Sequence, residues 1–243
     1  MIVSRYGRIV IPREMRKNSA LLTPMMTPTR NGYDAPDLDP SSDVKSLLSV
    51  VRSVEDNVEA VVEYLIDQGA DINAQDKYGM TPLHHTAIRG NRKALQKLLS
   101  SPGIIKEPRD VQDSTPLHLA ATYNQSIVAK ILLSDGDANP RALDNDLRTP
   151  LHEACLEGNT RVAKILLEKG KENEIVAKMT HDKDDDGATP LLLGVGKGGT
   201  DIVRLLLSYR ANPNQRNKEN VFPVHSAART GDLDTLRLLC EVK

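Results

Sequence analysis

Residues 144–170 read DNDLRTPLHEACLEGNTRVAKILLEKG, and this stretch is the unit that the rest of the chain copies. The hydroxyl of Thr149 can accept a hydrogen bond from a backbone N–H of a first helical turn. Pro150 follows at a position where a missing N–H costs nothing. Leu151 then begins a short apolar face at helical spacing. Gly158-Asn159 tolerates a left-handed backbone, and it predicts the end of this first helix.

A second helix is predicted directly after this loop. Its apolar stripe consists of Val162, Ile165, Leu166 and Leu167, and Gly170 stands where a C-terminal glycine cap is expected. Two helices of about ten residues each cannot bury such faces against each other alone. The unit therefore needs neighbours on both sides.

Copies of this unit recur along the chain. Thr-Pro occurs at Thr81, Thr115, Thr149 and Thr189, and Phe222-Pro223 takes the same place, with spacings of 34, 34, 40 and 33 residues. The motifs read TPLHHTA, TPLHLAA, TPLHEAC, TPLLLGV and FPVHSAA. A period of about 33 residues with T-P-L-H-x-A marks the ankyrin repeat. The sequence thus resembles the ankyrin-repeat family, which implies an all-α solenoid of stacked helix-turn-helix units with β-hairpin-like fingers.

The repeats divide the chain into three parts. Repeats are predicted to start near Asp76, Asp110, Asp144, Asp185 and Lys218, so the array covers residues 76–243. Residues 43–75 have helical apolar spacing without the TPLH start, and we interpret them as a degenerate N-terminal helix pair. Residues 1–42 contain five prolines and more basic than acidic residues, which predicts a disordered tail. The last repeat is truncated within its second helix, so we expect the natural array to continue.

The fourth repeat departs from the others. It is preceded by seven extra residues in KENEIVAKMTHDKD, which predict a lengthened loop that either binds something or is merely tolerated. Leu192 replaces the histidine of the motif, and four glycines follow at Gly194, Gly196, Gly198 and Gly199. Each glycine inside a helix costs about 0.5–1 kcal/mol relative to alanine. This repeat is therefore predicted to be the least stable.

Composition excludes several classes of protein. The net charge of -1 does not favour nucleic acid as a partner, and only 3% of the residues are aromatic. No apolar run reaches the length of about 18 residues that spans a bilayer, and no secretion signal begins the chain. The two cysteines lack metal-binding spacing and favour a reducing compartment. We expect a soluble, cytoplasmic chain without membrane contact in this segment.

The histidines, acids and cysteines do not predict catalysis or a cofactor. His84, His118, His152 and His225 share one slot of successive repeats, and the family resemblance implies that this histidine is buried and bonded to the neighbouring Thr hydroxyl and loop backbone. His85 and His181 lie outside the slot and have no ligand partner at useful spacing. Cys155 and Cys240 are both predicted on packed helices, as small apolar residues.

One acidic stretch resembles the start of a metal-binding motif. Asp182, Asp184, Asp186 and Gly187 fit the opening of an EF-hand calcium loop. The loop then fails, because Leu193 stands where a bidentate glutamate is required. We therefore predict no metal, and read these acids as the tip of a finger.

An array of this kind offers the finger tips and the solvent face of the first helices as one concave surface for a protein partner. The candidate binding residues at such positions are Tyr78, His85, Arg89, Gln112, Tyr123, Asn145, Glu153 and Glu157. Tyr78 and Tyr123 are the best anchors, because interface energy concentrates in aromatic residues and arginine.

Two functional classes follow. One is a stand-alone cytosolic adaptor or scaffold. The other is the cytoplasmic repeat region of a membrane protein, because residues 137–241 resemble part of the ankyrin-type transient receptor potential (TRPA) cation channels. That resemblance rests on ANPRALDNDLRTPLHEA, DDDGATPLLL and NVFPVHSAARTGDLDTL. It implies a long ankyrin array before six membrane helices, and this sequence contains no such helix, so channel activity would belong to residues beyond it.

Overall fold

The computed structural model describes residues 2–3, 9–10, 47, 51 and 58–241. The chain divides into two units, residues 1–41 and 42–243. In the first unit, β1 (Ile2–Val3) pairs with β2 (Ile9–Val10) in antiparallel register, with Ile2 opposite Val10. The rest of the tail predicted for residues 1–42 lies outside the described residues.

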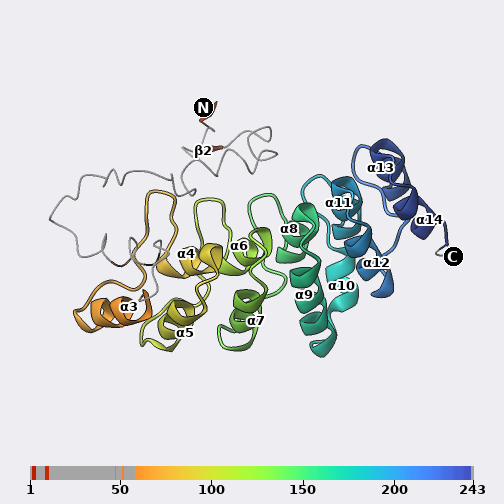
Figure 1. The fold of residues 1–243 in the computed structure, drawn as a ribbon. Coiled ribbons are helices and arrows are strands. Elements are labelled where there is room, and N and C mark those ends of the chain that lie inside the picture. The colour runs from red at the N-terminus through yellow and green to blue at the C-terminus, as the bar shows by residue number, and fades with distance from the viewer. Residues whose placement is uncertain (1, 4–8, 11–46, 48–50, 52–57, 242–243) are drawn as a thin grey trace, which may run out of the picture. The chain divides into compact units, whose positions relative to one another are not determined.

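The second unit is a stack of helix pairs. The inner helices of the pairs are α4 (Pro82–Arg89), α6 (Pro116–Thr122), α8 (Pro150–Glu157), α11 (Pro190–Lys197) and α13 (Pro223–Thr230). The outer helices are α5 (Arg92–Ser100), α7 (Ser126–Ser134), α9 (Thr160–Glu172), α12 (Thr200–Ser208) and α14 (Leu233–Glu241). Each layer runs in repeat order, and a loop leads from each pair to the next, except between α9 and α11, where a further short helix lies (Figure 1). The expectation of a helical solenoid is confirmed.

Before these pairs, α3 (Val58–Asp67) packs against α5. Leu47 and Val51 are buried and helical. The remaining residues before α3 in the helix pair predicted for 43–75 lie outside the described part of the chain.

The Thr-Pro motif starts the inner helices as its chemistry predicts. Thr115, Thr149 and Thr189 are N-caps whose hydroxyl oxygens accept from the N–H three residues later, and a proline follows each. Four inner helices end at a glycine with positive φ, of which Gly158 has φ 74°. An L-residue rarely adopts this conformation, so glycine defines the end of the helix.

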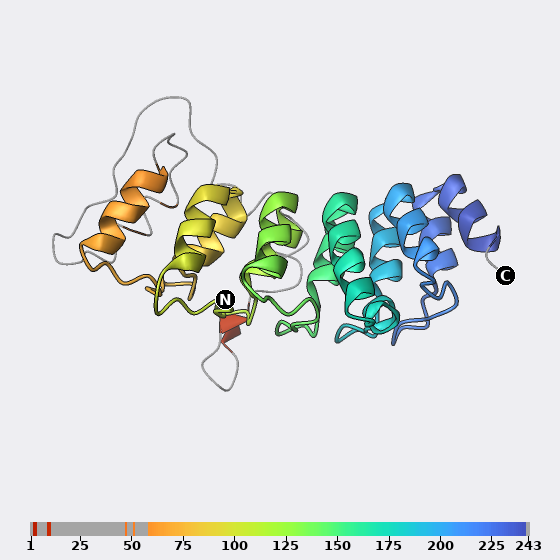
Figure 2. The ribbon, with the colours of Figure 1, turned by 90° about the horizontal axis from the view of Figure 1, so that it is seen from below.

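The core lies both between successive pairs and between the two helices of each pair. One leucine of each motif is fully buried in four of the inner helices: Leu83, Leu117, Leu151 and Leu191. Outer helices contribute Leu98, Leu132, Leu166 and Leu206, also fully buried. The outer helices lie side by side (Figure 2), so each pair covers the apolar face of its neighbour.

The extra residues before the fourth repeat form a helix, where a loop was predicted. α9 continues through Gly170 to Glu172, so the prediction that Gly170 caps this helix is wrong. A short helix, α10 (Val176–His181), follows and packs against α9. Met179 of α10 is buried, and a Cβ on Gly170 would lie 2.4 Å from its sulfur. The lack of a side chain at Gly170 thus allows Met179 to pack directly on α9.

The glycines of the fourth repeat have separate roles. Gly194 lies inside α11, where a Cβ would lie 3.2 Å from Cγ2 of Ile202. Gly198 and Gly199 cap the ends of α11 and α12, so they do not interrupt a helix. Gly196 alone lies in the helix with nothing within 4 Å of a Cβ.

Candidate protein-interaction surface

Each finger is a tight turn built around one acidic or amide side chain. The turns begin at Asp76, Asp110, Asp144, Asp184 and Asn217, and each first carbonyl accepts from the N–H three residues on at 2.8–3.1 Å. The Oδ1 atom of the same residue accepts from the N–H groups two and four residues on. The fourth and fifth turns thus begin one residue before the predicted repeat starts near Asp185 and Lys218.

Neighbouring fingers are joined to one another through the backbone. The N–H of Val111 donates to the carbonyl of Tyr78 at 3.0 Å, and the N–H of Asn145 donates to the carbonyl of Gln112 at 3.0 Å. Asp185 and Lys218 continue the same ladder, with N–H groups donating to Asp146 and Asp186 at 2.8 Å. These bonds hold adjacent tips at a fixed spacing, so neighbouring fingers form a connected surface.

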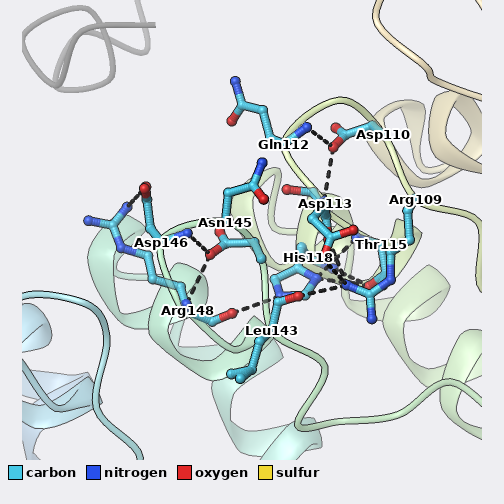
Figure 3. A network of polar contacts seen from close by, with 12 residues as sticks. Arg109, Asp110, Gln112, Asp113, Thr115, His118, Leu143, Asn145, Asp146 and Arg148 are labelled. Carbon is cyan, nitrogen blue, oxygen red and sulfur yellow. Dashed lines mark hydrogen bonds and ion pairs between the residues drawn. The ribbon is translucent and has the colours of Figure 1, made fainter. Parts of the chain in front are cut away.

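Arg109 connects the second finger to the third by hydrogen bonds. Its Nη1 donates to the carbonyl of Asp113 at 2.6 Å and to the carbonyl of Leu143 at 2.7 Å. Figure 3 shows this guanidinium between the two fingers, with His118 reaching the base of the third finger from below. Both bonds are exposed to solvent, and together they give the pair of fingers a definite relative position.

The motif histidines tie each inner helix to the next finger. Nδ1 of His118 accepts from the Thr115 N–H at 3.1 Å, and Nε2 lies 3.1 Å from the carbonyl of Arg148. A backbone N–H can only donate, so Nδ1 carries no proton and Nε2–H donates to the carbonyl. His84 and His152 repeat this pattern with the carbonyls of Ser114 and Asp182. The predicted structural role of these three histidines agrees with their bonding.

Burial keeps these imidazoles neutral. It lowers the pKa of His84 and of His152 to about 4, from the ordinary 6.5, although the carbonyl bonds act in the opposite direction. The pKa of His118 is lowered for the same reason. Protonation of Nδ1 would place its N–H opposite the threonine N–H. Two donors cannot bond to each other, so the hydrogen bond between the threonine and the histidine would be lost.

The last two repeats do not keep this arrangement. His225 is exposed, and its Nδ1 accepts only a long bond from the Phe222 N–H, at 3.4 Å. The prediction that His225 is buried like the others is therefore wrong, because Phe222 supplies no hydroxyl and no described finger covers the ring. Leu192 fills the slot in the fourth repeat and is buried, and its side chain has no polar atom to bond to the next finger.

Three of the predicted binding residues lie on the fingers. Tyr78 is 40% exposed, with Nζ of Lys77 4.9 Å from its ring centroid. Gln112 is half-buried, while Asn145 is exposed and its Nδ2 donates to the Val111 carbonyl at 3.3 Å. The finger ladder therefore places these three side chains on successive tips.

Three more lie on the inner helices. Arg89 is half-buried in the last turn of α4, and Tyr123 is half-buried at the end of α6. Burial raises the pKa of the Tyr123 hydroxyl, and the charge of Glu157 on the next helix raises it further. Glu157 itself is bonded to Nζ of Lys197 at 3.3 Å. Tyr123 and Glu157 thus belong to one group of neighbouring side chains.

Glu153 belongs to a charged cluster around Arg148. Nη1 of Arg148 lies 3.5 Å from Oε1 of Glu153, and Nε lies 3.7 Å from Oδ2 of Asp184. The Thr122 hydroxyl donates to Oε2 of Glu153 at 3.2 Å. Burial raises the pKa of Glu153 and of Asp184, and the positive charge of Arg148 opposes both increases. This cluster stabilises the base of the surface more than it offers groups to a partner.

Two expectations about exposed side chains are wrong. His85 is only 3% exposed, and its Nε2 lies 3.0 Å from Oδ2 of Asp76, so it supports the first finger from within. Asp184 is buried at the base of its finger, because its carboxylate accepts two backbone bonds.

Apolar side chains at the finger tips were missed. Val111 is 56% exposed and Leu147 is 48% exposed. Leu147 also has a φ of 57°, in the fourth place of its turn, where other fingers have Gly79 and Gly187. The sequence does contain a signal for them, because an apolar residue within a polar turn motif cannot reach the core and is therefore expected to be exposed.

The described residues contain no cluster of three His, Cys, Asp or Glu side chains able to hold a metal ion. The acids of the EF-hand-like stretch have other partners, since Asp182 pairs with Arg141 at 2.6 Å. Cys155 is buried, and burial raises the pKa of its thiol. Cys240 is exposed, so the prediction that it is packed is wrong. Between residues 58 and 241, no helix has the length and apolar character needed to cross a bilayer.

Three known proteins are similar to short parts of this chain. Transient receptor potential cation channel subfamily A member 1 of Homo sapiens is 38% identical over 64 residues, which cover 26% of this chain and 6% of that channel. An ankyrin repeat protein of Fowlpox virus (strain NVSL) is 48% identical over 40 residues, or 16% of this chain and 6% of the viral protein. An ADP-ribosylation factor GTPase-activating protein of Arabidopsis thaliana is 44% identical over 54 residues, or 22% and 7%.

Family matches cover far more of the chain. Ankyrin repeats (3 copies) match residues 101–179 and 172–243, and ankyrin repeats (many copies) match residues 51–99. Arrays of such repeats are modules for protein–protein interaction. With these matches over more than half of its length, and with stacked helix pairs joined by finger turns, the chain belongs to the ankyrin-repeat family.

Proposed function

We propose that this chain is a non-catalytic module that binds a protein partner across the finger tips and inner helices. The observation that supports this proposal is the rigid connection between neighbouring tips. Backbone bonds join the fingers of Tyr78, Gln112 and Asn145, so the backbone that carries these side chains is ordered before any partner arrives. A preorganised surface loses less conformational entropy on binding.

The anchors of this surface are Tyr78 and Tyr123. Tyr78 is exposed at a tip, and Tyr123 is half-buried near the charge of Glu157. Aromatic side chains bury a large area at low entropic cost, and a hydroxyl at the far end can still bond to a partner. Arg89, Gln112 and Asn145 surround them as polar contacts. His85 and Glu153 support the surface from beneath it.

The test is a loss of affinity in a double variant, Tyr78→Ala with Tyr123→Ala. A partner is first isolated from the native source, then purified, and its affinity for the full chain is measured by isothermal titration calorimetry. We expect the double variant to bind at least about tenfold more weakly. Tyr64→Ala is the matched control, because Tyr64 is an exposed tyrosine on α3, away from the fingers. Equal affinity of the double variant and the wild type would reject these anchors.

The wider role that we favour is the repeat region of a TRPA-type cation channel, on the cytoplasmic side. The observation that favours it is the 38% identity to a human channel of this subfamily over 64 residues. The alternative is a stand-alone cytosolic adaptor or scaffold. The similar viral protein is itself described only by its ankyrin repeats, which supports that alternative equally well.

Sequencing the transcript past the codon for Lys243 separates the two roles. Further repeats followed by six apolar stretches of about 20 residues would identify a channel. A stop codon after one polar capping helix would identify an adaptor. Neither result changes the prediction for the double tyrosine variant.

A further inference from the structure

The outer helices carry an excess of positive charge that the net charge of the chain conceals. The whole chain has a net charge of -1, with 32 basic and 33 acidic residues. The five outer helices together carry ten basic and five acidic residues, and three of these acids, Asp201, Asp234 and Glu241, lie on α12 and α14. The finger side has the opposite sign, because three successive turns begin DVQD, DNDL and DDDG. The two sides of the stack therefore suit different partners.

Part of this positive charge forms a row. Lys130, Lys164, Arg204 and Arg237 are each the fifth residue of their helix, in α7, α9, α12 and α14, and all four are exposed. These four helices contact one another in that order and lie side by side (Figure 2). One slot of the repeat thus places a cation on each of four neighbouring helices. We call these four residues the basic row.

The charges of the basic row are available to a partner. The only acidic contacts of the row within the described residues are Glu168, 3.9 Å from Lys164, and Asp234, 3.8 Å from Arg237. Both pairs are exposed and lie within one helix, so they neutralise little. Lys130 and Arg204 have no carboxylate within 4.0 Å in the part of the chain described. Arg161 adds a further exposed cation beside Lys164.

Two members of the row also border a hollow. A depression of about 230 Å³ lies between α12 and α14 and is lined by Thr200, Arg204, Asp234, Arg237, Leu238 and Glu241. Arginine binds a carboxylate with two parallel N–H bonds, so Arg204 can bind a carboxylate of a partner in this depression. Asp234 and Glu241 compete at the far side, which leaves Lys130, Lys164 and Arg204 as the stronger part of the row.

The spacing of the row specifies the shape of its ligand. Neighbouring packed helices lie about 8–10 Å apart, so successive cations have roughly that separation. A polyproline II segment has three residues per turn and rises about 3.1 Å per residue, so every third side chain points the same way about 9 Å apart. A segment with a carboxylate at every third position would therefore meet one cation per helix.

We propose that the basic row is a second docking surface, which binds an acidic, extended segment of a protein partner with Glu or Asp at every third position. It lies on outer helices, apart from the finger surface proposed above, so either proposal can fail without the other. Nucleic acid fits less well, because the row contains no aromatic side chain on which a base could stack. A lipid surface fits less well, because Ile127 and Leu233 are the only exposed large apolar side chains on α7, α9, α12 and α14.

The test uses two fluorescent peptides of equal composition and the full chain at low salt. One peptide contains four Glu-Pro-Pro triplets, and the other has the four glutamates in one block before eight prolines. We expect the triplet peptide to bind at least about tenfold more tightly by fluorescence anisotropy, because only its carboxylates match the row. Binding should weaken as salt rises. Equal affinities, or no binding at low salt, would overturn the proposal.

Variants decide whether the row itself binds. Lys130→Glu with Lys164→Glu should weaken triplet-peptide binding about tenfold or more, since two attractions become repulsions. The matched control is Lys171→Glu with Lys178→Glu, two exposed lysines off the row, with the same change in charge. Circular dichroism checks that both fold. Equal losses in the two variants would show nonspecific attraction and reject the row.

Competing ligands decide the class of partner. Vesicles of three parts phosphatidylcholine to one part phosphatidylserine, and a duplex DNA of twenty base pairs, are titrated against the same chain. If Lys130→Glu with Lys164→Glu weakens the binding of vesicles and DNA less than it weakens the binding of the triplet peptide, a protein partner is supported. Tighter, row-dependent binding of vesicles or DNA would reject it. Tyr78→Ala with Tyr123→Ala should leave triplet-peptide binding unchanged, which separates this surface from the finger surface.

Discussion

The third and fifth repeats have closely related motifs, TPLHEAC and FPVHSAA, and place the motif histidine in opposite environments. His152 is fully buried between Thr149 and the carbonyl of Asp182. His225 is exposed, and its ring and that of Phe222 are nearly perpendicular, with centroids 5.4 Å apart at an angle of 84°. The motif alone does not bury the histidine. Each of the three buried histidines has a threonine before it and a finger carbonyl beyond it, and His225 has neither among the described residues.

The comparison extends to every repeat. The first three repeats share the threonine, the histidine and a covering carbonyl. The fourth replaces the histidine by a buried leucine, and the fifth keeps the histidine but lacks the other two parts. The polar link between repeats is therefore concentrated in the first three, and the predictions below test what it contributes.

The largest expected effect is that of pH. The pKa of His84 and His152 is about 4 in the folded chain, below the ordinary 6.5. As pH falls, the unfolded chain takes up protons near 6.5 before the folded chain does. Stability is therefore present above pH 6.5 and is lost between pH 6.5 and about 4, by roughly 3 kcal/mol per histidine. Urea unfolding followed by circular dichroism between pH 7 and pH 4 measures this loss.

A variant isolates the histidine contribution from that of the carboxylates. Burial raises the pKa of Asp110, Glu153 and Asp184, so these groups act in the opposite direction as pH falls. Their effect is common to all variants compared. His152→Leu should reduce the loss of stability on acidification, and His225→Leu should not. Identical pH profiles for the two variants would contradict the comparison.

At neutral pH, removing the third histidine should cost more than removing the fifth. His152→Ala leaves a cavity and two buried backbone groups without partners, so we expect a loss of about 2–4 kcal/mol in the free energy of unfolding. His225→Ala should change it by less than about 0.5 kcal/mol, because the side chain is exposed. Urea unfolding at pH 7 gives both values. His152→Leu, which copies the fourth repeat, separates the lost volume from the lost bonds.

A smaller gain is expected at the tip of the third finger. Leu147 has a φ of 57°, a conformation that costs an L-residue energy, and its side chain is largely exposed. Leu147→Gly should stabilise the chain by about 1 kcal/mol, since glycine adopts this conformation without strain. Gly79→Leu is the reverse experiment, and its Cβ would lie 3.1 Å from the Val111 nitrogen. A gain in this reverse variant would refute the account of the fingers.

The smallest expected effect concerns the fourth repeat. Gly196→Ala adds a Cβ that meets nothing within 4 Å, so it should stabilise by about 0.5–1 kcal/mol. Gly194→Ala is the matched control and should not stabilise, because its Cβ would press on Ile202. Amide hydrogen exchange should be faster in α11 than in α6 and α7, and Gly196→Ala should slow it. Slower amide exchange in wild-type α11 than in α6 would contradict the prediction that the fourth repeat is the least stable.

The sequence by itself determined the period, the starts of the inner helices and the leucines between the layers. These features follow from local chemistry, because a Thr-Pro start and a helical apolar stripe act within one repeat. The eight binding residues were chosen from slots in that period. Six of them reach the finger and helix surface, while His85 and Glu153 support it from below, since their partners Asp76 and Arg148 come from the fingers.

Only the tertiary structure decided what each slot contacts. Gly170 became an interior glycine because Met179 of the inserted helix packs on it, and His225 became exposed because no described finger follows it. The basic row likewise depends on helices that are 33–40 residues apart in sequence and adjacent in space. A repeat specifies its own helices through short-range bonds, but the burial and charge of its surface depend on the neighbours that stack against it.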